Sequence, residues 1–153
     1  MGSADKLPLL KKSLYLVVNE MQADDRIAIV VYAGASGLVL PSTSGANKSR
    51  ILDAIENLES GGSTNGEAGI QLAYSTAVEN YISDGNNRVI LATDGDFNVG
   101  TSGDAELVRL IEQKRETGVY LSVLGFGTGN LQSSKMEKLA QNGNGNYFYI
   151  DNL

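Results

Sequence analysis

The residues with the clearest chemical potential are oxygen-bearing side chains in two short polar segments. Asp94 directly follows the apolar run at residues 89–92, which is typical of a buried parallel strand. Open α/β sheets bind ligands at the carboxyl ends of such strands. Thr64 ends a Gly-Gly-Ser-Thr segment before an expected helix; its hydroxyl can act as an oxygen ligand, and the glycines let backbone approach a bound group closely. The two segments indicate a metal site rather than an active-site nucleophile.

The composition narrows the chemistry further. The chain has 153 residues, no Cys, no His and a formal net charge of −6. The length suits one domain with a substantial core. The lack of Cys and His excludes thiolate and imidazole zinc sites, triads that need His, and disulfides, so a metal must be held by oxygen, which favours Mg²⁺, Ca²⁺ or Mn²⁺. The negative charge argues against nucleic acid as a partner, and no apolar run predicts insertion into a membrane.

Helical and strand periodicities alternate along the whole chain. Helices are expected at residues 6–21, 48–59, 66–81, from 101–104 to just before Gly118, and at 134–141; strands are expected at 26–32, 38–40, 87–93, 119–126 and 147–150. The strand at 26–32 is too apolar to have a wet face. Strands that alternate with helices form parallel βαβ units. The sequence therefore predicts a single α/β domain over residues 1–153, with a doubly wound, mostly parallel, Rossmann-like sheet flanked by helices.

Local signals predict where some of these elements begin and end. Thr64 and Glu67 fit a capping box for the third helix, with Thr64 as the N-cap. Ser134 and Glu137 fit a second capping box for the last helix. Pro41 should stop the short second strand, which we expect at a sheet edge.

Asp94 has other interpretations besides a metal ligand. Asp-Gly is common turn chemistry. An EF-hand is excluded, because Val99 and Ala105 stand where its loop needs Gly and Glu. Strand-Asp-x-Asp resembles the first motif of haloacid-dehalogenase-like phosphatases, with Asp94 as nucleophile and Asp96 as acid/base, although the motif lies mid-chain and Asn98 replaces the usual Thr or Val. A further alternative is a structural α/β domain with a vestigial metal site.

Five segments carry a family resemblance when taken in order: residues 6–10 (KLPLL), 25–32 (DRIAIVVY), 61–64 (GGST), 90–95 (ILATDG) and 143–147 (GNGNY). Together they resemble a von Willebrand factor type A (VWA) domain of the bacterial cell-envelope kind. The resemblance implies a divalent cation, Mg²⁺ or else Mn²⁺ or Ca²⁺, at a metal-ion-dependent adhesion site (MIDAS) built from three loops. It assigns Thr64 to the second loop and Asp94 to the third. By loop position, Gly62, Ser63, Asp96 and Phe97 border the binding face.

The function implied by the resemblance is metal-dependent protein binding of the adhesion type, not catalysis. A carboxylate of the protein partner is expected to complete the coordination of the cation, in a fold that suits a hard ion with oxygen ligands. The resemblance also implies an extracytoplasmic location in the bacterial envelope.

The chain departs from the family pattern at both ends. The first strand with its Asp-x-Ser-x-Ser motif should precede Met1, and a final helix should follow the strand at 147–150, so we expect an incomplete domain. Without that motif the chain should bind Mg²⁺ very weakly or not at all. The missing strand normally lies between those at 26–32 and 88–93, so the isolated chain should be unstable, swapped with a neighbour, or dependent on sequence from elsewhere.

Overall fold

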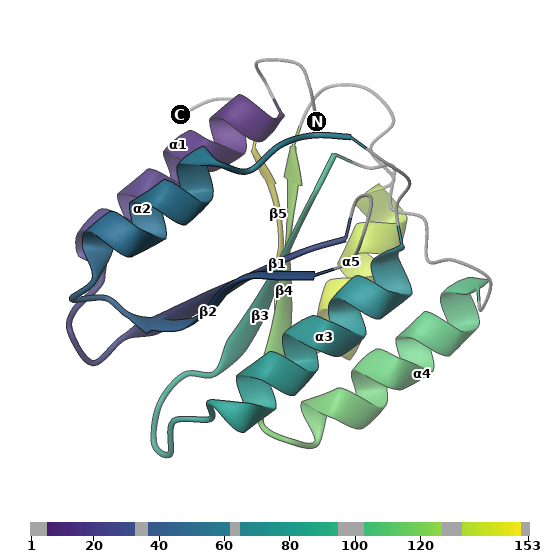
Figure 1. Ribbon diagram of the computed structural model, residues 1–153. Helices are drawn as coiled ribbons and strands as arrows, with labels where there is room; N and C mark the ends of the chain where they lie inside the picture. The colour runs from purple at the N-terminus through teal and green to yellow at the C-terminus, as the bar shows by residue number, and fades with distance from the viewer. Residues whose placement is uncertain (1–5, 33–36, 62–64, 95–102, 127–132, 151–153) are drawn as a thin grey trace.

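The computed structural model describes residues 6–32, 37–61, 65–94, 103–126 and 133–150. Helices and strands alternate along these ranges as the periodicity predicts (Figure 1). The helices are α1 (Leu7–Glu20), α2 (Lys48–Glu56), α3 (Gly66–Glu79), α4 (Gly103–Arg115) and α5 (Ser133–Asn142). The strands are β1 (Arg26–Val31), β2 (Gly37–Ser44), β3 (Arg88–Thr93), β4 (Tyr120–Phe126) and β5 (Tyr147–Ile150).

The strands form two hydrogen-bonded groups. β3, β4 and β5 make a parallel sheet in that order, which confirms the predicted βαβ units. β1 and β2 pair antiparallel, which the prediction of a mostly parallel sheet leaves room for. The physical reason is the short connection between β1 and β2, since a parallel crossover needs a dozen or more residues.

β2 lies at the edge of its sheet, as expected, but it does not stop at Pro41. It continues to Ser44, and its pairing with β1 is irregular between Ile27 and Val30. Proline has no N–H to donate, so it is accommodated at an edge or a bulge rather than in a central strand. The expectation that Pro41 ends the strand is therefore wrong.

Helices cover the strands on both sides (Figure 1). α1 and α2 lie side by side on one side, and α3, α4 and α5 lie on the other. The main core is made by the side of β3 and β4 that faces α3 to α5, including Leu91, Leu121 and Val123. Because strand side chains alternate between faces, Phe126 lies on the opposite face and packs against Leu10 of α1.

The last helix and the end of α4 refine two local predictions. α5 begins at Ser133, so Ser134 lies inside the helix and does not act as its N-cap. Helix ends are the least certain part of a sequence pattern, because a shift of one residue in the helix start makes a different residue the N-cap. Gly118, expected just after α4, takes a left-handed φ of 86°, and its N–H donates to the carbonyl of Arg115.

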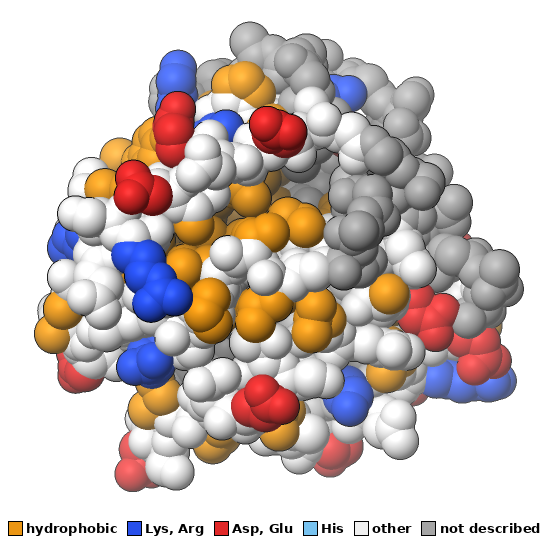
Figure 2. Space-filling model, viewed as in Figure 1, with side chains coloured by type: hydrophobic (Ala, Val, Ile, Leu, Met, Phe, Trp, Pro, Cys, Tyr) orange, Lys and Arg blue, Asp and Glu red, His pale blue; other side chains and the backbone are white. Residues whose placement is uncertain are grey.

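A gap separates the two strand groups. β1 is paired only with β2 and β3 only with β4 among the described residues. β1 does not have the fully buried side chains that its apolar sequence predicts: Arg26 is exposed and the other five residues are half-buried. Figure 2 shows hydrophobic side chains lining a hollow near the middle of the same view, between the segment after α2 and the strands β1 and β2.

The face of the β3–β5 sheet toward α1 is covered only in part. Ile90 is 57% exposed and Phe148 is 53% exposed, although Leu10 and Phe126 are buried at the end of the same face. Leu16 and Val17 of α1 are also exposed. No helix in the described part of the chain is long and apolar enough to span a membrane.

Candidate functional site

Tyr32 joins the end of β1 to the two segments predicted to carry the site. Its backbone carbonyl accepts a hydrogen bond from the N–H of Asn65, 2.9 Å away, at the start of α3. Its hydroxyl donates to the backbone carbonyl of Ala92 in β3, at 2.7 Å. Asn65 directly follows Thr64 in the chain, and Ala92 lies two residues before Asp94. The described neighbours of Thr64 therefore lie at the same end of the fold as Asp94.

The direction of the Ala92 carbonyl shows how Tyr32 reaches β3. The N–H of Tyr120 in β4 donates to the carbonyl of Asn87, so that carbonyl points toward β4. Successive residues of a strand point their backbone groups to opposite sides. The Ala92 carbonyl, five residues along, thus points away from β4 toward the gap, and the tyrosine reaches it from the β1 side.

The start of α3 differs in detail from the predicted capping box. The N-cap is Asn65, whose side-chain oxygen accepts a hydrogen bond from the N–H of Ala68 at 3.2 Å. Glu67 does not reach back to a cap; it accepts a hydrogen bond from the side chain of Gln71 at 3.3 Å. The box is wrong because the helix begins one residue later than Thr64 requires, and Asn is as good an N-cap as Thr.

Asp94 lies just past the end of β3 and is the one proposed metal ligand that the structure describes. Its Oδ2 atom is 3.6 Å from Nζ of Lys6, the residue that precedes α1. The side chain of Asp94 is 15% exposed and that of Lys6 is 28% exposed. An ion pair in this partly shielded setting is weakened less by solvent than one on the open surface.

The pKa of the Tyr32 hydroxyl depends on its surroundings, including the charge of Asp94. Burial raises the pKa of Tyr32 to about 12; a hydrogen bond from the Thr93 side chain lowers the pKa, and the negative charge of Asp94 raises it. The hydroxyl therefore stays protonated and remains a donor at neutral pH. A neutral donor and a lysine thus flank the end of β3.

Close packing holds Tyr32 in place. A Cβ atom added to Gly69 of α3 would lie 2.4 Å from Cβ of Tyr32, far closer than real side chains approach. Glycine at this position lets α3 pack directly on the tyrosine. Helix α3 and the end of β1 are therefore held together by both backbone hydrogen bonding and packing.

The remaining predicted site residues lie outside the described residues. These are Thr64, Gly62, Ser63, Asp96 and Phe97. Within the described ranges, no group of three or more acidic, His or Cys side chains is arranged to hold a metal. The described part of the site offers a divalent cation one carboxylate, and a lysine already neutralises it, so these residues alone do not fit the cation.

Sequence reasoning missed three residues that organise this end of the fold. The sequence places Tyr32 in a strand and Lys6 in a helix, both within the family motifs, and Asn65 in the cap segment, without linking any of them to Asp94. A signal existed for Lys6, because a cation at a helix N-terminus opposes the helix dipole and needs an anion elsewhere. No sequence signal pairs Tyr32 with Ala92, because that contact depends on how two strands are placed.

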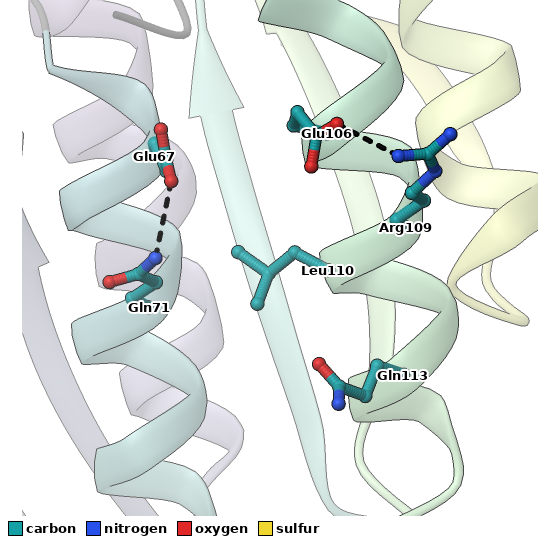
Figure 3. A pocket seen from close by; sticks show the side chains of 6 residues that line it. All are labelled: Glu67, Gln71, Glu106, Arg109, Leu110 and Gln113. Atoms are coloured by element: carbon teal, nitrogen blue, oxygen red, sulfur yellow. Dashed lines mark hydrogen bonds and ion pairs between the residues drawn. The ribbon is translucent and has the colours of Figure 1, made fainter. Parts of the chain in front are cut away.

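A groove lies elsewhere in the described part of the chain, between α3 and α4 (Figure 3). It has a volume of about 470 Å³ and does not include Asp94. Its charged side chains pair along their own helices, Arg109 with Glu106 at 2.8 Å and Gln71 with Glu67 at 3.3 Å. Such exposed pairs one turn apart are ordinary helix-surface features, so this groove is not the candidate site.

Comparisons with known proteins agree with the fold and the family resemblance. A sequence similar over the whole chain is "Uncharacterized protein YfbK" of Escherichia coli (strain K12), at 48% identity over 153 residues; these make up 27% of that protein. The chain therefore spans about a quarter of the relative's length.

Solved structures show the same fold. BatB from Bacteroides thetaiotaomicron superposes with a TM-score of 0.77 at 21% identity, covering 99% of this chain and 84% of that one. Proximal thread matrix protein 1 of the mussel byssus, with a zinc-occupied MIDAS motif, superposes with a TM-score of 0.74 at 17% identity, covering 97% and 39%.

These similarities confirm the predicted Rossmann-like α/β fold class, and the sequence match identifies the family directly. The family model of the von Willebrand factor type A domain matches residues 2–153. The chain thus belongs to the von Willebrand factor type A domain family, as its sequence motifs predicted.

Proposed function

We propose that this domain recognises another protein at the end of the fold where α3 begins and β3 ends, with help from a divalent cation. VWA domains are a family with protein-interaction roles at MIDAS sites. The observation that carries the proposal is the pair of hydrogen bonds at Tyr32, accepted from the N–H of Asn65 and donated to the carbonyl of Ala92, which supports a common location for Thr64 and Asp94. Thr64 and Asp94 would then be two of several oxygen ligands, and Gly62, Ser63, Asp96 and Phe97 would border the contact surface.

The electrostatics of this end suit an acidic partner group. In Figure 1 the parallel strands run toward the top of the view, and α3 begins at that end. The N-terminus of a helix carries partial positive charge and attracts anions. Together with Mg²⁺, Mn²⁺ or Ca²⁺, it would favour a carboxylate from the protein ligand. The net charge of −6 gives no basis for binding nucleic acid at the same surface.

The cation needs ligands beyond those described. We infer that a further strand, from outside residues 1–153, fills the gap between β1 and β3 and brings the first ligand loop with it. A tyrosine side chain is ~6.5 Å from Cα to hydroxyl. With the 2.7 Å hydrogen bond to Ala92, Tyr32 spans nearly the ~9.6 Å of two strand spacings. That reach suits one strand between β1 and β3, which would replace Tyr32 as the partner of the Ala92 carbonyl.

Without that strand, we expect the 153-residue chain to bind Mg²⁺ very weakly or not at all. Isothermal titration of the chain with MgCl₂ measures this directly. Micromolar affinity would contradict the expectation. A cooperative melt of a monomer near ~60 °C, typical of a complete mesophilic domain, would contradict the need for a further strand.

A structural role with a vestigial metal site is the second candidate. It is favoured by the ion pair between Lys6 and Asp94, which gives the carboxylate a partner without any metal. The haloacid-dehalogenase-like phosphatase has no support among the similar proteins, and the family match favours an interaction module over an enzyme. We further propose the extracytoplasmic side of a bacterial envelope as the location.

The decisive experiment is a Mn²⁺ titration of the protein extended through the reading frame that precedes Met1. Micromolar Mn²⁺ binding that is lost in Asp94→Asn and retained in Asp24→Asn, an exposed aspartate, is the expected result. Mg²⁺-dependent capture of an envelope protein, reversed by a chelator and lost in Asp94→Asn, would then identify the partner. Equal Mn²⁺ affinity in Asp94→Asn and its parent would refute the proposed site.

A further inference from the structure

The ion pair of Lys6 and Asp94 joins the start of α1 to the end of β3. Nζ of Lys6 lies 3.6 Å from Oδ2 of Asp94, and both side chains are mostly shielded from solvent. Within the described ranges, Asp94 is not part of any group of three or more acidic, His or Cys side chains that could hold a metal. The positive charge beside Asp94 thus belongs to a lysine that the fold itself supplies.

The backbone fixes where this lysine begins. The carbonyl of Lys6 accepts a hydrogen bond from the N–H of Leu10 at 2.9 Å, so the first turn of α1 anchors its Cα atom. The first turn of α1 contains no acidic residue, and the N-cap residue Lys6 makes no side-chain capping hydrogen bond. A positive charge at a helix N-terminus is unfavourable unless an anion is near. Among the described residues, Asp94 is the anion that pairs with Lys6.

We propose that Lys6 is a tethered cation: it occupies the metal's place beside Asp94, and a divalent cation reaches Asp94 only by displacing it. This inference rests on the proposed function, because it takes Asp94 as a ligand. An ion of charge 2+ at Asp94 would lie a few ångströms from the ammonium, and like charges repel in proportion to their product. The flexible four-carbon stem of lysine lets the ammonium swing away when a stronger cation arrives.

A purely structural ion pair is the competing explanation. Partly exposed pairs contribute little to stability, and removing one should lower stability slightly without changing cation affinity. A tethered cation makes a different prediction: removing the lysine charge should increase the affinity of the site for the divalent cation. Cation affinity therefore separates the two roles, whereas a stability measurement alone does not.

The test is a Mn²⁺ titration of the protein extended through the reading frame that precedes Met1, because the 153-residue chain alone is expected to bind a divalent cation very weakly or not at all. The relaxation of water protons reports bound Mn²⁺ directly. Lys6→Met removes the charge and keeps the length of the side chain, and Lys6→Gln is made as a second variant in case Lys6→Met does not fold. Lys138→Met, at an exposed lysine of α5, is the matched control.

We expect Lys6→Met to tighten Mn²⁺ binding by about ten-fold or more, and Lys138→Met to leave it unchanged. The gain should vanish in the double variant Lys6→Met/Asp94→Asn. Affinity equal to or weaker than that of the parent in Lys6→Met and Lys6→Gln, or no binding at millimolar Mn²⁺, overturns the inference. If Asp94→Asn leaves the Mn²⁺ affinity of the parent unchanged, the proposed function fails instead.

Discussion

The hydroxyl of Tyr32 offers the sharpest test of how this end of the fold is held together. It donates to the Ala92 carbonyl at 2.7 Å and so ties β1 to the β3 edge that lacks a strand partner in the described chain. Tyr32→Phe removes the hydroxyl and keeps the ring that packs against Gly69. The substitution therefore isolates one contact between the two strand groups.

The expected cost follows from the environment of this hydrogen bond. The bond is partly buried, and a buried carbonyl that loses its donor costs about 1–3 kcal/mol. Because water can reach part of the gap, we expect about 2 kcal/mol, in the middle of that range. With a urea m-value of about 2 kcal/mol/M, the unfolding midpoint should fall by about 1 M.

Urea unfolding followed by far-ultraviolet circular dichroism measures that midpoint. Tyr81→Phe is the matched control, because Tyr81 is 46% exposed and should change the midpoint by less than about 0.25 M. An unchanged m-value would show that the loss is one of stability and not of cooperativity. If Tyr32→Phe and Tyr81→Phe unfold at the same urea concentration, the hydroxyl does not link the two strand groups.

Three further predictions concern packing, capping and pH. Gly145→Ala should lower the free energy of unfolding by about 3 kcal/mol or more, because the added Cβ would lie 1.7 Å from the Leu121 carbonyl oxygen. Gly37→Ala is the control: an added Cβ there has nothing within 4 Å and should cost under about 0.5 kcal/mol. Similar thermal melts for the two variants would refute this prediction. Lys48→Met should cost about 1–2 kcal/mol, because Nζ donates to the carbonyls of Val18, Asn19 and Met21 at the end of α1, at 2.6, 3.2 and 3.1 Å, and equal midpoints for Lys48→Met and Lys138→Met would contradict that role. Since the folded pKa of Tyr32 is about 12, above the unfolded value of 10.0, its contribution to stability is complete below pH 10 and is lost as pH rises toward 12; urea midpoints between pH 9 and 12 should fall less steeply for Tyr32→Phe than for the parent, and parallel curves would count against the shift.

Much of the fold was predictable because local patterns and tertiary structure agree. The apolar run that ends at Thr93 predicted β3 within one residue, and the strand at 147–150 was predicted with its bounds. Where local predictions failed, a small shift of a helix start or the position of a strand at a sheet edge was responsible. Asn65 replaced Thr64 as the N-cap, and β2 continues past Pro41 to Ser44 at the edge of its sheet.

The candidate site divides in the same way. Asp94 was predicted from its place after a buried strand, and its carboxylate does lie at the carboxyl end of β3. Its ion pair with Lys6 was not predicted, because periodicity says nothing about which helix start meets which strand end. The ligand roles predicted for Asp94 and Thr64 remain predictions that the described residues do not test.

The sequence by itself determined the order of helices and strands, the family and the oxygen-only chemistry, because periodicity, motif order and the absence of Cys and His are one-dimensional properties. Tertiary structure alone decided that β1 and β3 stay apart, that Tyr32 spans from one to the other, and that a lysine neutralises Asp94. Those contacts join residues far apart in the chain. They depend on the spacing of packed elements, which no local pattern encodes.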